Sequence, residues 1–146
     1  MAIREVQEAF ANAVLARGER VTDQTYDDEG TSSTFEGRRW QEVKPHELAM
    51  VTACLWHLTP SAVCAYLPAF LVASLESPSS GIADATIQFI TPPKGNPRRP
   101  SFAAWWLHLS SRQQFAVVAF LREMSESALG EHAETLAELE KACTAS

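Results

Sequence analysis

The sequence predicts an all-α fold, a single compact domain of five or six helices around a central helical hairpin. Apolar residues recur three and four positions apart in several segments, which is the spacing of one helix face. The pair Thr59-Pro60 follows one such segment directly and is typical of a helix start, so two helices should meet in a tight turn there. The β-type alternation of Thr86 to Ile90 has no second strand to pair with. A chain of 146 residues, 46% of them hydrophobic, is expected to form one core.

The first element should be an amphipathic helix over residues 2–17, because Ile3, Val6 and Phe10 recur at helical spacing among charged residues. Gly18 would then end it. An acidic loop is expected over residues 19–34, which are rich in Asp, Gly, Ser and Thr.

The central hairpin consists of two predicted helices, Pro45–His57 and Pro60–Leu75. In each, a proline occupies the first turn, where its missing N–H has no cost. Pro68 lies inside the second helix, is unable to donate to the carbonyl of Cys64, and is expected to kink or split the segment. The carbonyl region freed in this way is one candidate partner for the hydroxyl of Tyr66.

The C-terminal half begins with Ile82–Ile90, which the sequence leaves open as a short extended piece or a weak helix. A Pro-rich basic loop over residues 91–100 follows, and then a short helix from Ser101 to Leu109. Ser110 and Gln113 form a capping box that should open the next helix. The last predicted helix runs from His132 to about Cys143. The predicted core contains Phe10, Leu48, Val51, Leu55, Leu67, Phe70, Leu71, Phe115, Val118 and Leu121.

Composition and charge exclude several classes of function. The net charge is -6, and four basic residues with no acid occur between residues 92 and 112, so general nucleic-acid binding is not expected. No apolar run is long enough to span a membrane, and charged Arg4, Glu5 and Glu8 stand where an export signal would be apolar. We therefore expect a cytoplasmic protein with reduced cysteines, and a Cys54–Cys64 bridge is disfavoured.

The common catalytic and phosphate-binding motifs are missing from the sequence, and no cofactor is expected. An alternative hypothesis is a small enzyme or metal-dependent protein whose site contains His46, Glu47, His57 and the acidic loop. The loop partly matches a calcium-binding loop, but it begins with Thr25 in place of Asp and occurs once, which favours a solvated loop.

A third hypothesis concerns Trp105 and Trp106, which are adjacent in a predicted helix. Only one of two neighbouring side chains on a helix faces the core squarely, so we expect the other to be partly exposed, and packing in the core and at its rim is favoured over a binding surface. A scaffold or subunit could associate through that exposed ring.

The leading hypothesis is a non-catalytic protein-binding module. Small size, acidic charge and missing catalytic motifs are features of immunity and inhibitor proteins, which neutralise a toxin or enzyme by occlusion. The contact residues would be Asp23, Asp27, Asp28 and Glu29, because four acidic side chains within seven residues form a surface complementary to a basic partner. The sequence does not predict the oligomeric state.

One set of residues also carries a family resemblance. The set is Trp40, the segment from Leu58 to Leu75 with its Leu-Thr-Pro and Tyr-Leu-Pro-Ala-Phe-Leu blocks, Thr91-Pro92-Pro93, Gln114 and Phe120-Leu121. This pattern resembles a family of small bacterial proteins of unknown function. The resemblance implies a bacterial intracellular context and no particular activity.

Overall fold

A computed structural model describes residues 2–16, 18–22, 34–91, 100–127 and 133–145 of the chain. These residues form an all-α structure, as predicted; within them the β structure is one isolated antiparallel bridge between Thr22 and Leu58. The elements in chain order are α1 (Ala2–Ala9), η1 (Trp40–Glu42), α3 (Pro45–Ala49), η2 (Thr52–His57), α4 (Pro60–Glu76), α5 (Gly81–Ile90), α6 (Pro100–Trp106), α7 (Ser111–Ser127) and α8 (Ala133–Ala145).

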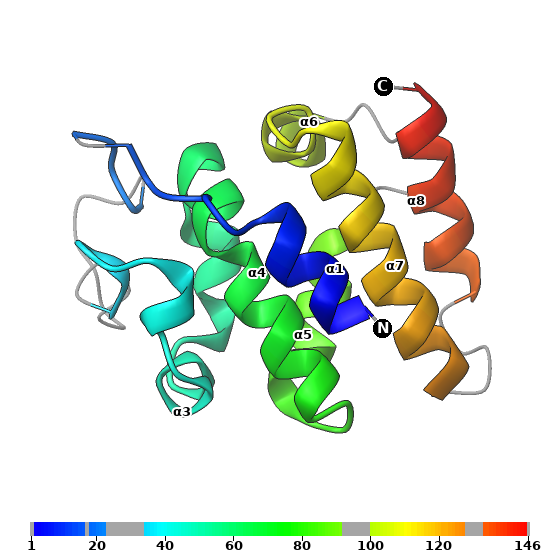
Figure 1. The fold of residues 1–146 in the computed structure, drawn as a ribbon, viewed down its shortest axis with the longest axis horizontal. Coiled ribbons are helices and arrows are strands. Elements are labelled where there is room, and N and C mark those ends of the chain that lie inside the picture. Colours follow the sequence, from blue (N-terminus) through cyan, green and yellow to red (C-terminus); the bar gives the residue numbers. More distant parts are fainter. Residues whose placement is uncertain (1, 17, 23–33, 92–99, 128–132, 146) are drawn as a thin grey trace.

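Helix α4 forms the centre of the structure (Figure 1). It packs against α1, η1, α3, α5, α6 and α7, whereas α8 lies at one edge against α7. A helix that is apolar on every side needs neighbours around it, and this arrangement supplies them on nearly every side.

The start of α4 confirms its sequence prediction, because the Thr59 hydroxyl accepts a hydrogen bond from the N–H of Ala62 at 3.1 Å. The same hydroxyl donates to the carbonyl of Arg20 at 2.7 Å. Of the two effects expected of Pro68, a kink or a split, the split does not occur, since α4 continues unbroken to Glu76. Packing on nearly all sides of this buried segment outweighs the one missing backbone bond.

The first arm of the hairpin is not the continuous helix predicted over Pro45–His57. It divides into α3 and the 3-10 helix η2, and the N–H groups of Met50 and Val51 bond to carbonyls three residues earlier. An α-helix and a 3-10 helix both place residues three apart on almost the same face, so the apolar spacing does not distinguish them.

Helix α1 is shorter than predicted and ends at Ala9 instead of Arg17. Its last carbonyls are satisfied by side chains from elsewhere: Trp40 Nε1 donates to the Phe10 carbonyl at 2.9 Å, and Gln113 Nε2 donates to the Ala9 carbonyl at 3.3 Å. Tertiary donors therefore set the end of the helix.

Residues Ile82–Ile90 belong to a helix, α5, which decides between the two possibilities that the sequence left open. The Ser80 hydroxyl caps it by accepting from the N–H of Ala83 at 3.3 Å. The capping box before α7 is confirmed, with Gln113 N–H bonded to Ser110 Oγ at 3.1 Å and Ser110 N–H bonded to Gln113 Oε1 at 3.0 Å.

The predicted core is confirmed except at Phe115, which is 66% exposed. The neighbouring Gln114 takes the inward position instead, and its side-chain amide donates to the carbonyl of Trp106 at 3.1 Å. Gln114 thus satisfies the buried Trp106 carbonyl and occupies the inward face of the helix, whereas Phe115 faces outward.

The prediction that Trp105 or Trp106 would be partly exposed is also wrong, because they are 3% and 2% exposed. Trp105 stacks on Phe89 of α5 with ring centroids 5.3 Å apart, and Trp106 stacks on Phe102 at 5.4 Å. Trp105 is covered by a ring of α5 and Trp106 by a ring of its own helix, and both are buried, so neither tryptophan offers a surface for association.

Candidate functional site

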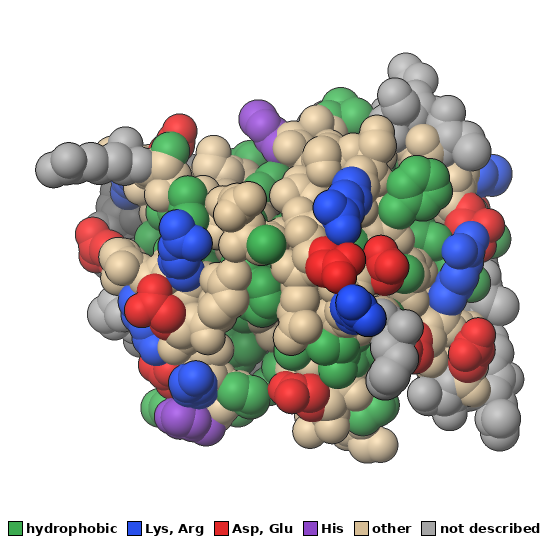
Figure 2. All heavy atoms as spheres, in the orientation of Figure 1, with side chains coloured by type: hydrophobic (Ala, Val, Ile, Leu, Met, Phe, Trp, Pro, Cys, Tyr) green, Lys and Arg blue, Asp and Glu red, His purple; other side chains and the backbone are tan. Residues whose placement is uncertain are grey.

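A groove of about 530 Å³ lies between α1 on one side, η1 and the start of α3 on the other, and α4 beneath. Figure 2 shows this face of the molecule, on which α1 and the η1–α3 segment stand at either side of α4. Its volume is in the range of about 300–1,000 Å³ that is usual for ligand-binding clefts.

The floor of the groove is one stripe of α4. Ala69, Val72, Ala73 and Glu76 follow one another at intervals of three, one and three residues, which places them on the same face of the helix. The two alanines are short, so they leave space above the helix where longer side chains would have filled it. The floor is apolar up to Glu76.

The two walls are bonded to each other. Trp40 lines the groove, and its indole N–H donates to the carbonyl of Phe10 at the end of α1. Next to it, Gln41 Nε2 donates to the carbonyl of Ala11 at 3.2 Å. At its other end, α1 is held by the bond from Ala2 N–H to Glu123 Oε1 of α7 at 3.1 Å. The groove therefore has fixed walls before any ligand arrives.

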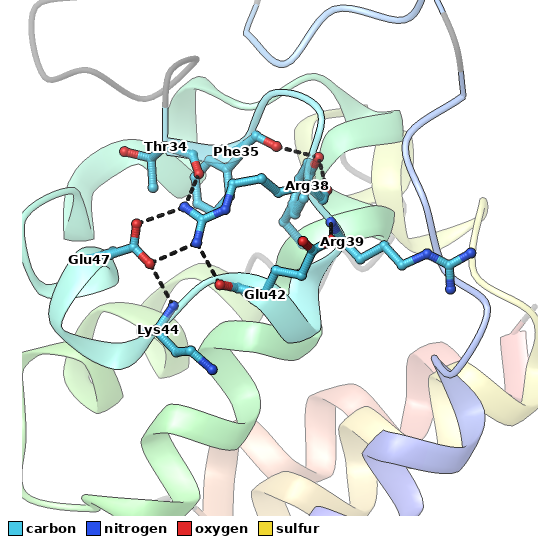
Figure 3. A network of polar contacts seen from close by, with 8 residues as sticks. Thr34, Phe35, Arg38, Arg39, Glu42, Lys44 and Glu47 are labelled. Carbon is cyan, nitrogen blue, oxygen red and sulfur yellow. Dashed lines mark hydrogen bonds and ion pairs between the residues drawn. The ribbon is translucent and has the colours of Figure 1, made fainter.

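Arg38 supports the η1–α3 wall from behind (Figure 3). Its guanidinium donates to both carboxylate oxygens of Glu47, at 2.7 and 2.9 Å, and to the carbonyls of Thr34 and Glu42. Glu47 in turn accepts from the backbone N–H of Lys44 at 3.0 Å. One arginine thus joins the turn before η1 to the start of α3.

The electrostatics of this clamp favour the ionised form of Glu47. The hydrogen bonds from Arg38, and next those from the Lys44 backbone, lower the pKa of Glu47 from its ordinary 4.5 to about 2. Tyr66 completes the support, since its hydroxyl bonds the carbonyls of Phe35 at 2.8 Å and Arg38 at 2.7 Å. These two carbonyls are not the ones near Pro68 that the sequence suggested as partners of the Tyr66 hydroxyl. Burial raises the pKa of Tyr66 and keeps the hydroxyl protonated as a donor.

The rim of the groove contains charged and amide side chains. Gln7, Lys44 and Glu76 line it and are exposed, and their side chains have no hydrogen bond or ion pair within the part of the chain that the structure describes. Figure 3 shows the Lys44 side chain extending away from the Arg38–Glu47 pair. The polar groups at the rim are thus available to a ligand.

The predicted contact residues Asp23, Asp27, Asp28 and Glu29 lie outside the described residues. The described residues on either side of them are held in place. Thr22 pairs with Leu58 across the isolated bridge, and Thr34 accepts the hydrogen bond from Arg38.

The alternative site of His46, Glu47 and His57 receives no support from the geometry. His46 and His57 are exposed, and Glu47 is engaged by Arg38 as a structural partner. Residues 23–33 of the acidic loop, the fourth part of that site, lie outside the described residues. Among the described residues, no group of three His, Cys, Asp or Glu side chains is placed to hold a metal ion.

The Cys64 thiol is free and donates to the carbonyl of Trp105 at 3.5 Å, and the side chain of Cys54 lies outside the described part of the structure. Burial raises the pKa of the Cys64 thiol to about 11, which makes it a poor nucleophile at neutral pH.

Sequence reasoning missed the groove and the Arg38 clamp. Part of the clamp had a local signal, because Glu42 and Glu47 each stand three residues after the backbone N–H that they cap, at Arg39 and Lys44. The groove had no such signal, since it depends on three separated segments of the chain.

Comparison with known proteins identifies the family. A family model described as a family of unknown function (DUF6714) matches residues 2–142, so the chain belongs to this family, and the resemblance to a family of unknown function is confirmed. No curated protein and no solved structure matches the chain. Within the described residues, none of the helices combines the length and apolar character needed to cross a bilayer.

Proposed function

We propose that this member of the family is a non-catalytic protein-binding module. The observation that carries the proposal is the groove itself, which joins an apolar floor to a rim of unengaged polar side chains. Such a combination suits the docking of another molecule, because apolar contact supplies affinity and the rim supplies orientation.

The fixed walls support the same proposal. Trp40, Gln41 and Arg38 hold them through hydrogen bonds made within the protein. Because these walls are already ordered, docking of a partner costs little conformational entropy on this side of the interface, and this favours binding.

We further propose that the protein acts as an immunity or inhibitor protein, which neutralises a toxin or enzyme by occlusion in the cytoplasm without a cofactor. The net charge of -6 and the cluster of Asp23, Asp27, Asp28 and Glu29 favour a basic partner.

The test uses the product of the adjacent reading frame as the candidate partner. The variant replaces Asp23, Asp27 and Asp28 by Asn and Glu29 by Gln. We expect association to slow by about tenfold at low salt and the difference to shrink at high salt, because charge complementarity mainly accelerates encounter. Stopped-flow or surface binding at several salt concentrations measures this.

A matched control removes four other acidic side chains, those of Glu5, Asp84, Glu126 and Glu140, and so makes the same change in net charge. All four are exposed. An equal loss of rate in both variants would show that total charge, and not the acidic loop, governs capture. No association of the unsubstituted proteins at micromolar concentration would contradict the choice of partner.

A further inference from the structure

We propose that the groove binds a short peptide segment of the partner, with an aliphatic centre and one charge of each sign beside it. The inference rests on the proposed function and assigns the chemistry that the groove recognises. Three features of the groove carry it: the floor, the amides of the rim and the charges of the rim.

The floor selects aliphatic side chains. Ala69 and Ala73 are 5% and 4% exposed and form the bottom of the groove, and Val72 between them is the partly exposed apolar side chain of the floor. From Ala69 to Glu76 the stripe covers about 10 Å along the helix axis. This length matches about three residues of an extended peptide.

The rim amides suit a peptide backbone. A backbone N–H or C=O laid over an apolar floor needs a hydrogen-bond partner, since a buried polar group without one is unfavourable. Gln41 uses its N–H group for the Ala11 carbonyl, which leaves its side-chain oxygen as an acceptor. Gln7 is exposed on the opposite wall and offers both a donor and an acceptor.

The rim charges select a ligand with both signs. Lys44 and Glu76 line the same groove without an ion pair between them or with another described residue. A ligand with only acidic side chains would be repelled by Glu76. A ligand with only basic side chains would be repelled by Lys44. A segment with one acid and one base satisfies both rim residues.

The test is an NMR titration of the isotopically labelled full chain with the capped peptide Lys-Leu-Val-Leu-Glu. We expect saturable amide shifts at Gln7, Gln41, Lys44 and Val72, with a Kd of about 0.1–1 mM, as is usual for a short flexible peptide. The same peptide with three serines in the centre should produce no saturable shifts.

Charge variants of the rim sharpen the test. Glu76→Lys should lower the affinity for the Lys-Leu-Val-Leu-Glu peptide by about two- to fivefold, and this variant should bind Glu-Leu-Val-Leu-Glu more tightly. Lys44→Glu should instead bind Lys-Leu-Val-Leu-Lys more tightly. Both residues are exposed, so the thermal midpoints should match that of the unsubstituted protein. Unaltered preference in both variants would overturn the assignment of the rim.

The inference is overturned if about 5 mM peptide, well above the expected Kd, leaves the groove amides unshifted. Shifts centred on another exposed apolar side chain, such as Trp56, would also overturn it. Capture of the protein partner with a failed peptide titration would reject the peptide assignment alone, whereas failure of both experiments would reject the proposed function as well.

Discussion

The inner face and the groove face of α4 are both mainly apolar in sequence, but they differ in how far their side chains are buried. On the inner face, Leu67, Phe70 and Leu71 are fully buried against neighbouring helices. On the groove face, the short side chains of Ala69 and Ala73 are buried, whereas Val72 is partly exposed and Glu76 is exposed. One face holds the protein together, and the other is left open between two fixed walls.

The polar side chains near α4 also form two groups, those that bond backbone carbonyls and those that do not. The hydroxyls of Thr59 and Tyr66, the indole of Trp40 and the amide of Gln114 all donate to backbone carbonyls of other segments. These residues are among those that carry the family resemblance, and each stabilises the fold. The rim residues Gln7, Lys44 and Glu76 have no such role in the described structure. The bonds that hold the fold therefore use other side chains than Gln7, Lys44 and Glu76, which the proposed docking surface would use.

The largest effect should come from Phe70→Ala on the inner face. Removing a fully buried phenylalanine leaves a cavity, and we expect the free energy of unfolding to fall by about 3–5 kcal/mol. Urea unfolding measures the change. Val72→Ala on the groove face is the matched comparison and should lower the same quantity by less than about 1 kcal/mol. Equal losses for the two variants would remove the distinction between the faces.

Tyr66→Phe should have a smaller effect. It keeps the ring and removes the hydroxyl that bonds the carbonyls of Phe35 and Arg38. We expect the free energy of unfolding to fall by about 1–2 kcal/mol, because the Arg38 carbonyl loses its bond from the hydroxyl and the Phe35 carbonyl keeps only its bond from the Arg38 N–H. A Tyr66→Phe protein as stable as the original would mean that water replaces the hydroxyl at no cost.

Glu47→Gln tests the support of the η1–α3 wall through pH. The folded-state pKa of Glu47, about 2, lies below its ordinary 4.5, so the ionised side chain stabilises the folded state above about pH 4.5. That contribution is lost as the pH falls from 4.5 to about 2. Thermal midpoints over this window should fall more steeply for the original protein than for Glu47→Gln. Parallel curves would contradict a role for the ionised carboxylate.

Local features of the fold were predictable from the sequence. The Thr59 cap and the box formed by Ser110 and Gln113 depend on residues three apart, and the structure has both. The end of α1 was not predictable, because it depends on donors from Trp40 and Gln113, which are distant in the sequence. Local spacing describes one helix at a time and omits such partners.

The errors at Phe115, Trp105 and Trp106 have the same origin. Burial of Gln114 depends on a carbonyl of another element, and burial of both tryptophans depends on rings from α5 and α6 that cover them. The groove is likewise a product of three segments. The acidic residues Asp23 to Glu29, in contrast, were evident from the sequence as a cluster, and their role stays a prediction.

Hydrogen–deuterium exchange of the complex with the adjacent reading frame's product tests the central claim most directly. If the open face of α4 is the docking surface, added protection should fall on the segments around Gln7, Gln41 to Lys44 and Val72 to Glu76, and on the acidic loop. Protection confined to α7 and α8, with these segments unchanged, would contradict the account.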